Sequence, residues 1–172
     1  MKNSKITYKL VLSGILCAFA IISFVIESLF PPIIIPGARM GISNIFILLA
    51  TILIGNVYGY AILVIKITLG SLFAGNISSV IYSLPAGLVS LTVEIILLYF
   101  LQRISVIAIS VSGAVINTTV QNLTFCLVTG SAEYLIYLPY LACVGIIAGL
   151  IVGLAVFLTV RFIPQRYIDK LY

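Results

Sequence analysis

The chain has 172 residues, of which 63% are hydrophobic and 8% are charged, with a formal net charge of +5. Soluble domains carry about 25% charged residues, so this composition excludes a soluble globular protein and predicts an integral membrane protein. A membrane-spanning helix takes about 20 residues, which leaves room for roughly six helices and for no ATPase domain. No P-loop motif occurs in the chain.

The apolar runs predict an all-α bundle of about six transmembrane helices, which forms a single membrane domain over residues 1–172. The predicted spans cover residues 9–30, 39–55, 57–75, 80–101, 104–129 and 134–163. The second and third spans are divided at Gly55 and Asn56, because one helix through both would be longer than the bilayer is thick.

Basic residues predict the orientation of this bundle. Seven of the nine lie at or before the start of the first span, between the fourth and fifth spans, or at or beyond the end of the last span. They are Lys2, Lys5, Lys9, Arg103, Arg161, Arg166 and Lys170. With six spans these three places face the same side, which the positive-inside rule makes cytoplasmic. The sequence therefore predicts a cell-membrane protein with cytoplasmic N- and C-termini, and no nucleic-acid partner.

The segment Pro31–Asn44 joins the first two predicted spans on the outer side of the membrane. Its three prolines break any helix that passes through them. One interpretation is a lid over a cavity, with Arg39 and Asn44 at its edge. The other is an ordinary connection, in which Arg39 pairs with Glu27 or Glu133.

Two ionisable residues lie within predicted spans, where charges are costly and usually face a bundle interior. Lys66 is near the middle of the third span, and Glu94 is in the inner half of the fourth. They can form a buried pair that holds these helices together. Lys66 can also line a cavity and meet an anionic ligand, and the two interpretations are compatible.

The fifth span carries a polar stripe at steps of three and four residues, which places its members on one helix face. The stripe consists of Ser110, Gly113, Asn117, Gln121 and Thr124. Amides that faced lipid would be unpaired, so the stripe is predicted to point inward. It would serve either hydrogen bonds between helices or a hydrogen-bonded heteroaromatic or sugar-like ligand.

Polar residues from several spans gather toward the outer half of the bundle and predict an outward-facing cavity. The candidate ligand-binding residues are Arg39, Asn44, Lys66, Asn76, Tyr82, Asn117 and Gln121. Catalytic and metal-binding residues are not predicted. The chain has no histidine, its three cysteines lie apart within apolar runs, and Glu94 has no nucleophile at a recognisable spacing.

Small residues indicate two close helix contacts. Gly14 and Ala18 are four residues apart in the first span, a spacing that lets another helix approach closely. That helix can belong to this bundle or to a separate membrane subunit. Gly145, Gly149 and Gly153 recur at the same spacing in the last span, where packing within the bundle is predicted.

Three segments resemble the Gx transporter family, which is also labelled heptaprenyl diphosphate synthase component I. They are PGARMGISNIFILLA at 36–50, KITLGSLFAG at 66–75 and YSLPAGLVSL at 82–91. This family is similar to the substrate-binding S components of energy-coupling factor (ECF) transporters. Those six-helix proteins bind a vitamin-like ligand from outside and dock onto a transmembrane coupling subunit that carries two ATPases.

The resemblance implies a non-enzymatic S component that binds a small anionic ligand, such as a flavin or a quinone-pathway compound, and needs no cofactor. It makes Gly14 and Ala18 the contact with the coupling subunit. Lys66 stands where this family is expected to have arginine, so charge is kept but bidentate recognition is weakened. The alternative is a non-catalytic scaffold for a prenyl-diphosphate, quinone-pathway or extracellular electron transfer enzyme. Synthase chemistry is not expected, because it needs aspartate-rich magnesium sites and Asp169 is the only aspartate.

Overall fold

The computed structural model describes residues 2–29, 41–100 and 105–163, and all of its regular elements are helices. The α-helices are α1 (Lys2–Leu29), α2 (Asn44–Leu53), α3 (Asn56–Phe73), α4 (Val80–Phe100), α5 (Val106–Thr129) and α6 (Leu138–Phe162). Short 3₁₀ helices, η1 (Ile77–Ser79) and η2 (Ala132–Tyr137), precede α4 and α6. The predicted all-α fold is confirmed.

Five helical segments are long and apolar enough to cross a membrane, so the chain is a multi-pass membrane protein. Three of them are the single helices α1, α3 and α5. The other two are continuous segments, one formed by η1 and α4 and the other by η2 and α6. The sixth helix, α2, is shorter than predicted, with 10 residues. At 1.5 Å per residue it is about 15 Å long, roughly half the thickness of the hydrocarbon core.

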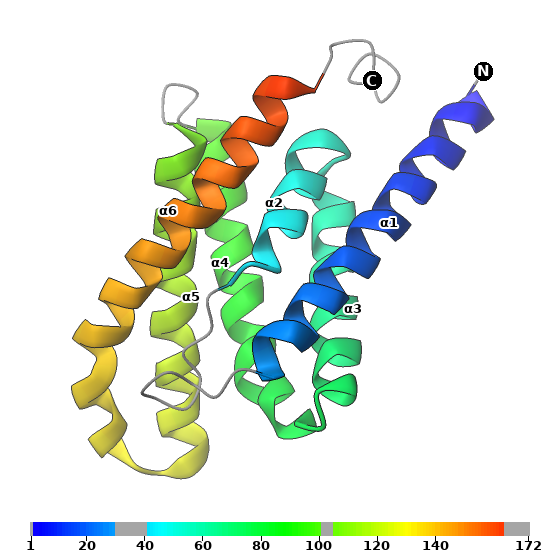
Figure 1. The fold of residues 1–172 in the computed structure, drawn as a ribbon. Helices are drawn as coiled ribbons and strands as arrows, with labels where there is room; N and C mark the ends of the chain where they lie inside the picture. Colours follow the sequence, from blue (N-terminus) through cyan, green and yellow to red (C-terminus); the bar gives the residue numbers. More distant parts are fainter. Residues whose placement is uncertain (1, 30–40, 101–104, 164–172) are drawn as a thin grey trace.

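The helices run alternately up and down, and α1 begins at the same end of the bundle at which α6 ends (Figure 1). This end carries Lys5 and Arg161, as the basic residues predict. In Figure 1, α2 starts at about mid-height and rises toward that end, between α1 and α6. The first residues of α2 therefore lie deep inside the bundle.

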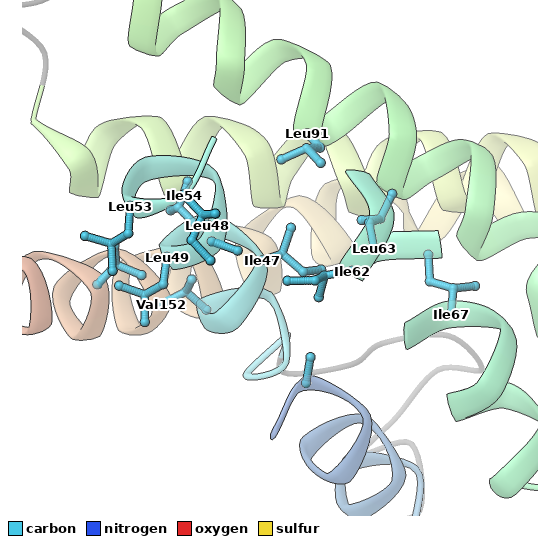
Figure 2. Close-up of a cluster of buried hydrophobic side chains, with 13 residues drawn as sticks. Ile47, Leu48, Leu49, Leu53, Ile54, Ile62, Leu63, Ile67, Leu91 and Val152 are labelled. Carbon is cyan, nitrogen blue, oxygen red and sulfur yellow. The ribbon is translucent and has the colours of Figure 1, made fainter. Parts of the chain in front are cut away.

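The short α2 is the centre of the hydrophobic core. Six of its ten residues are buried, so it faces protein on most of its surface rather than lipid. Its side chains pack against α1, α3 and α6, and the buried cluster around it, drawn in Figure 2, extends to Leu91 of α4. The residues in contact include Ile47, Leu48, Leu49, Leu53, Ile62, Leu63, Leu91 and Val152. This packing holds the first turn of α2 in place beside α3.

Glycines allow α5 and α6 to make the most extensive helix–helix contact of the described residues. A Cβ atom on Gly149 would lie 2.6 Å from Cα of Val111, and one on Gly153 would lie 2.7 Å from Cα of Ile107. Gly145 also faces the α5 backbone. The predicted internal packing of this glycine face is therefore confirmed.

The small-residue face of α1 does not pack within the described part of the bundle. Gly14 and Ala18 are both exposed, and no atom lies within 4 Å of a Cβ built on Gly14. The interpretation of this face as an internal contact is therefore wrong. Docking onto another membrane subunit stays a prediction.

Candidate ligand-binding cavity

A cavity of about 50 Å³ lies between α1, α3, α4, α5 and the turn that precedes α2. Its polar lining consists of Glu27, Ser43, Asn44, Lys66, Ser83, Asn117, Thr118 and Gln121. The apolar part of the wall is formed by Phe24, Leu63 and Ile67. A volume of this size holds about three to five water molecules, or the acid group of a larger molecule.

Lys66 is the buried cation of this cavity. Its side chain is 4% exposed, although it lies in the middle of the spanning helix α3. The ammonium donates a hydrogen bond of 2.8 Å to Oδ1 of Asn44 and one of 3.4 Å to Oγ of Ser43. It also lies 5.7 Å from the ring centroid of Phe24. Intramembrane charges usually mark a site or a pathway, and this one points at the first turn of α2.

Glu27 brings the opposite charge into the same cavity. Oε1 accepts a hydrogen bond of 2.8 Å from N–H of Ser43, and Oε2 accepts one of 3.2 Å from N–H of Gly41. Gly41 has a φ of 68°, a left-handed conformation that glycine adopts readily. Glu27 is therefore not simply solvated at the outer interface, because this carboxylate is partly buried and lines the cavity. Its predicted pairing with Arg39 stays a prediction, since Arg39 lies outside the described residues.

The sequence contains a signal that Glu27 faces the interior of the bundle. Glu27 is three residues after the buried Phe24 and seven after the buried Ala20, so all three lie on the inward face of α1. A carboxylate on the buried face of a spanning helix is expected to have partners inside the bundle.

The polar stripe of α5 serves two different purposes along its length. Asn117 and Gln121 line the cavity, and Nε2 of Gln121 donates a hydrogen bond of 3.5 Å to Oγ of Ser83 on α4. One to two turns earlier, Ser110 and Gly113 are buried in helix contacts. The prediction that the stripe points inward is confirmed, and its amides are the part that reaches the cavity.

Glu94 lines a second, smaller cavity of about 20 Å³, whose wall also includes Asn44 and Asn117. Its carboxylate occupies the space beside Gly113 on α5, where a Cβ atom would collide with it. Glu94 also interacts electrostatically with Lys66. The two cavities share wall residues, so Glu94 belongs to the surroundings of the candidate site.

Two predicted ligand-binding residues, Asn76 and Tyr82, line neither of these two cavities. Asn76 is exposed in the turn before η1 and lines neither cavity. The ring of Tyr82 packs edge-to-face on Phe125, at 5.7 Å between centroids. Arg39 lies outside the described residues, as does most of the predicted lid. Asn44, Lys66, Asn117 and Gln121 are brought together as predicted.

A sequence model of the family described as heptaprenyl diphosphate synthase component I matches residues 16–158. The chain belongs to this family. No curated protein and no solved structure matches the chain. The family name describes one component of a synthase, which implies a partner subunit in a complex.

The match to the component I family covers both cavities and most of the bundle, from the second half of α1 to the end of α6. Among the described residues, no group of three histidine, cysteine, aspartate or glutamate side chains could hold a metal ion. What the described part of this component I protein offers is a polar cavity with one buried ammonium and one carboxylate in its wall.

Replacing Gly113 by alanine in this component I protein is expected to destabilise it by about 1 kcal/mol, the lower end of the cost of overpacking, because the neighbouring atoms belong to a side chain that can shift. The added methyl group would collide with the Glu94 carboxylate. The measurement is the unfolding midpoint in detergent. On a Glu94→Ala background the same change should cost little, because the colliding atoms are gone. An equal loss on both backgrounds would contradict the prediction.

Proposed function

We propose that this chain is the substrate-binding S component of an ECF-type transporter. It would bind a small acidic, vitamin- or cofactor-like ligand in the cavity around Lys66. The observation that carries this proposal is the convergence of a buried ammonium with two amides on α5 and one at the start of α2. Small-molecule sites combine an apolar wall with a few convergent polar groups in this way.

The position of the cavity supports binding from the outer side. Glu27 is close to the end of α1, Ser83 is close to the beginning of α4, and Gln121 is in the later half of α5. All three positions are away from the end of the bundle at which α1 begins (Figure 1). With cytoplasmic N- and C-termini, as the basic residues predict, the cavity is in the outer half of the cell membrane.

The chemistry of the wall supports a ligand with an acid group and further hydrogen-bonding atoms. Lys66 supplies a charged donor, and the amides of Asn117 and Gln121 supply both donors and acceptors. A flavin or a quinone-pathway compound combines these features with a ring system. We propose this ligand class, and no cofactor is needed for binding it.

The exposed face of α1 supports docking onto a coupling subunit. Gly14 and Ala18 present an open, small-residue surface of the kind that membrane helices use for close approach. We propose that a transmembrane ECF coupling subunit binds there and that two ATPase subunits drive the cycle. The family description is consistent with such a complex, since it implies a partner.

Native extraction followed by mass spectrometry tests the proposed function. The expected result is co-purification with a coupling subunit and two ATPases, and release of a small acidic compound from the purified protein. Absence of both the subunits and a retained small molecule would overturn the proposal.

Replacing Gly14 by leucine is expected to reduce co-purification of the coupling subunit by about tenfold or more, the usual effect of altering a central interface position. Stability and ligand retention of the isolated protein should be unchanged, because no atom lies within 4 Å of a Cβ atom at Gly14. The matched control is Ala61→Leu, which places the same side chain at an exposed position of α3. Equal effects of the two changes would contradict a specific contact.

A second candidate function rests on the family description, which names a component of a synthase. In this alternative the chain is a non-catalytic membrane scaffold for a prenyl-diphosphate, quinone-pathway or electron-transfer enzyme. Asn117→Ala distinguishes the two functions. A scaffold would keep its enzyme partner and its activity in the cell, whereas an S component would lose ligand binding.

A further inference from the structure

The turn before α2 is held from two sides by opposite charges. On one side, the Glu27 carboxylate accepts hydrogen bonds from the N–H groups of Gly41 and Ser43. On the other side, the Lys66 ammonium donates to the side-chain oxygens of Ser43 and Asn44. Ser43 is 2% exposed and takes part in both sets of contacts. All five groups belong to the wall of the cavity.

A carboxylate is the chemical group that an acidic ligand would bring to this cavity. The N–H groups of Gly41 and Ser43 bind carboxylate oxygens now, and the Lys66 ammonium lies at hydrogen-bond distance from Ser43. Hydrogen bonds to ionised groups are roughly twice as strong as neutral ones. An oxyanion that entered this place would gain the same donors and a buried cation beside them.

The size of the cavity supports the same view. About 50 Å³ is enough for an acid group, and it is well below the roughly 300 Å³ or more of typical small-molecule sites. The Glu27 side chain reaches this space from α1 and spans to the turn before α2. Withdrawal of that side chain would both vacate the donors and enlarge the space beside Lys66.

We propose that the Glu27 carboxylate occupies the acid-group subsite of the ligand cavity, and that an oxyanion of the ligand displaces it and releases the end of α1 from the turn before α2. This inference rests on the proposed function, and it names the ligand class as a carboxylate or a phosphate ester. Glu27 acts as an internal competitor that keeps the empty cavity neutralised. The helix that it releases is the one that carries the exposed Gly14 and Ala18 face.

The expected effect follows from competition. If Glu27 fills the subsite about nine-tenths of the time, its removal raises the apparent affinity for an oxyanion by about tenfold, because the binding-competent fraction rises to one. If Glu27 is instead a fixed structural support, Glu27→Gln leaves the affinity unchanged or weakens it. The two roles therefore predict opposite directions of change.

The test is a titration of the purified full chain with sodium acetate and with inorganic phosphate, and with acetamide as the neutral counterpart of acetate. The chain has no tryptophan, so a single Ile42→Trp reporter, placed next to Ser43, monitors the turn by fluorescence. Saturation by acetate or phosphate, and none by acetamide, is expected. Glu27→Gln should lower the half-saturating anion concentration about tenfold, and which of the two anions saturates tells carboxylate from phosphate recognition.

Glu133→Gln is the matched control, because Glu133 is an exposed carboxylate in the first turn of η2 and lines neither cavity. It should leave the titration unchanged. An unchanged or raised half-saturating concentration in Glu27→Gln, or no saturation by either anion in the unaltered protein, would overturn the inference. Ligand retention in the unaltered protein tests the proposed function separately, so the inference can fail while the S-component assignment stands.

A second measurement guards against a variant that folds poorly. Spin labels at Ile26→Cys on α1 and Leu127→Cys on α5, both exposed positions, report their separation in a background without native cysteines. Acetate or phosphate should shift the distance distribution of the unaltered Glu27 protein. In Glu27→Gln the shifted distribution should be present without anion. Identical distributions in all four samples would overturn the inference.

Discussion

Replacing Lys66 by methionine is expected to abolish ligand retention and to destabilise the bundle by about 1–3 kcal/mol, the cost of leaving buried hydrogen-bond acceptors without their donor. Methionine preserves the length of the side chain but removes the ammonium. Asn44 and Ser43 would lose a donor, and Glu94 would lose an attractive charge. The measurements are the ligand content of the purified protein and its unfolding midpoint in detergent.

The double variant Lys66→Met/Glu94→Gln separates the two roles of Lys66. Removing both ionisable groups should restore part of the stability, because no buried acid group is then left at position 94 without the neighbouring cation. It should not restore ligand retention, which needs the cation itself. Lys5→Met serves as the control, since Lys5 is an exposed lysine near the beginning of α1. If the double variant recovered its ligand, Lys66 would be a structural residue alone.

Replacing Gly149 by valine is expected to separate α5 from α6 and to destabilise the protein by about 3 kcal/mol or more, at or above the upper end of ordinary overpacking. The Cβ atom would lie 2.6 Å from Cα of Val111 and 3.0 Å from the carbonyl oxygen of Ser110. These neighbours are backbone atoms, so a rotamer change cannot make room. A lowered unfolding midpoint and a smaller yield of folded protein are the expected results.

Gly14→Val is the matched control for this change, because it places the same side chain on a helix position with no atom within 4 Å. The unfolding midpoint of this variant should equal that of the unaltered protein or lie above it, since valine favours the helix over glycine. If Gly149→Val and Gly14→Val behaved alike, the close α5–α6 approach would not be important for stability.

Long apolar runs made most of the fold predictable. Hydrophobic stretches of spanning length have a strong signal, and charged residues such as Arg161 mark the same end of the bundle as Lys5. The length of α2 was harder to predict, because Gly41 and Ile42 continue the apolar pattern while the backbone of Gly41 takes a left-handed turn. Hydropathy depends on the composition of such a segment, so it does not reveal that the backbone turns at Gly41 before α2 begins.

The candidate site was predictable where polar residues recur within one helix. Asn117 and Gln121 stand at helical spacing on α5, and Lys66 stands alone in an apolar helix, so each signals its inward position. Contacts between residues that are far apart in the sequence leave no comparable pattern within a single helix. The positions of Tyr82 and Asn76 along the chain predict that they lie at a similar height in the membrane to these residues. Height in the membrane does not tell on which face of a helix a side chain lies.

The shortness of α2 also bears on how the protein is built into the membrane. Ten apolar residues do not reach across the hydrocarbon core, so α2 cannot be held in a bilayer as an independent span in the way that α1 or α3 can. Its buried side chains find their partners on α1, α3 and α6. We therefore expect the long helices to insert into the membrane before α2 packs against them. Since Ser43 and Asn44 contact Lys66 only when α2 is packed in this position, we expect the candidate cavity to form in the final step of assembly.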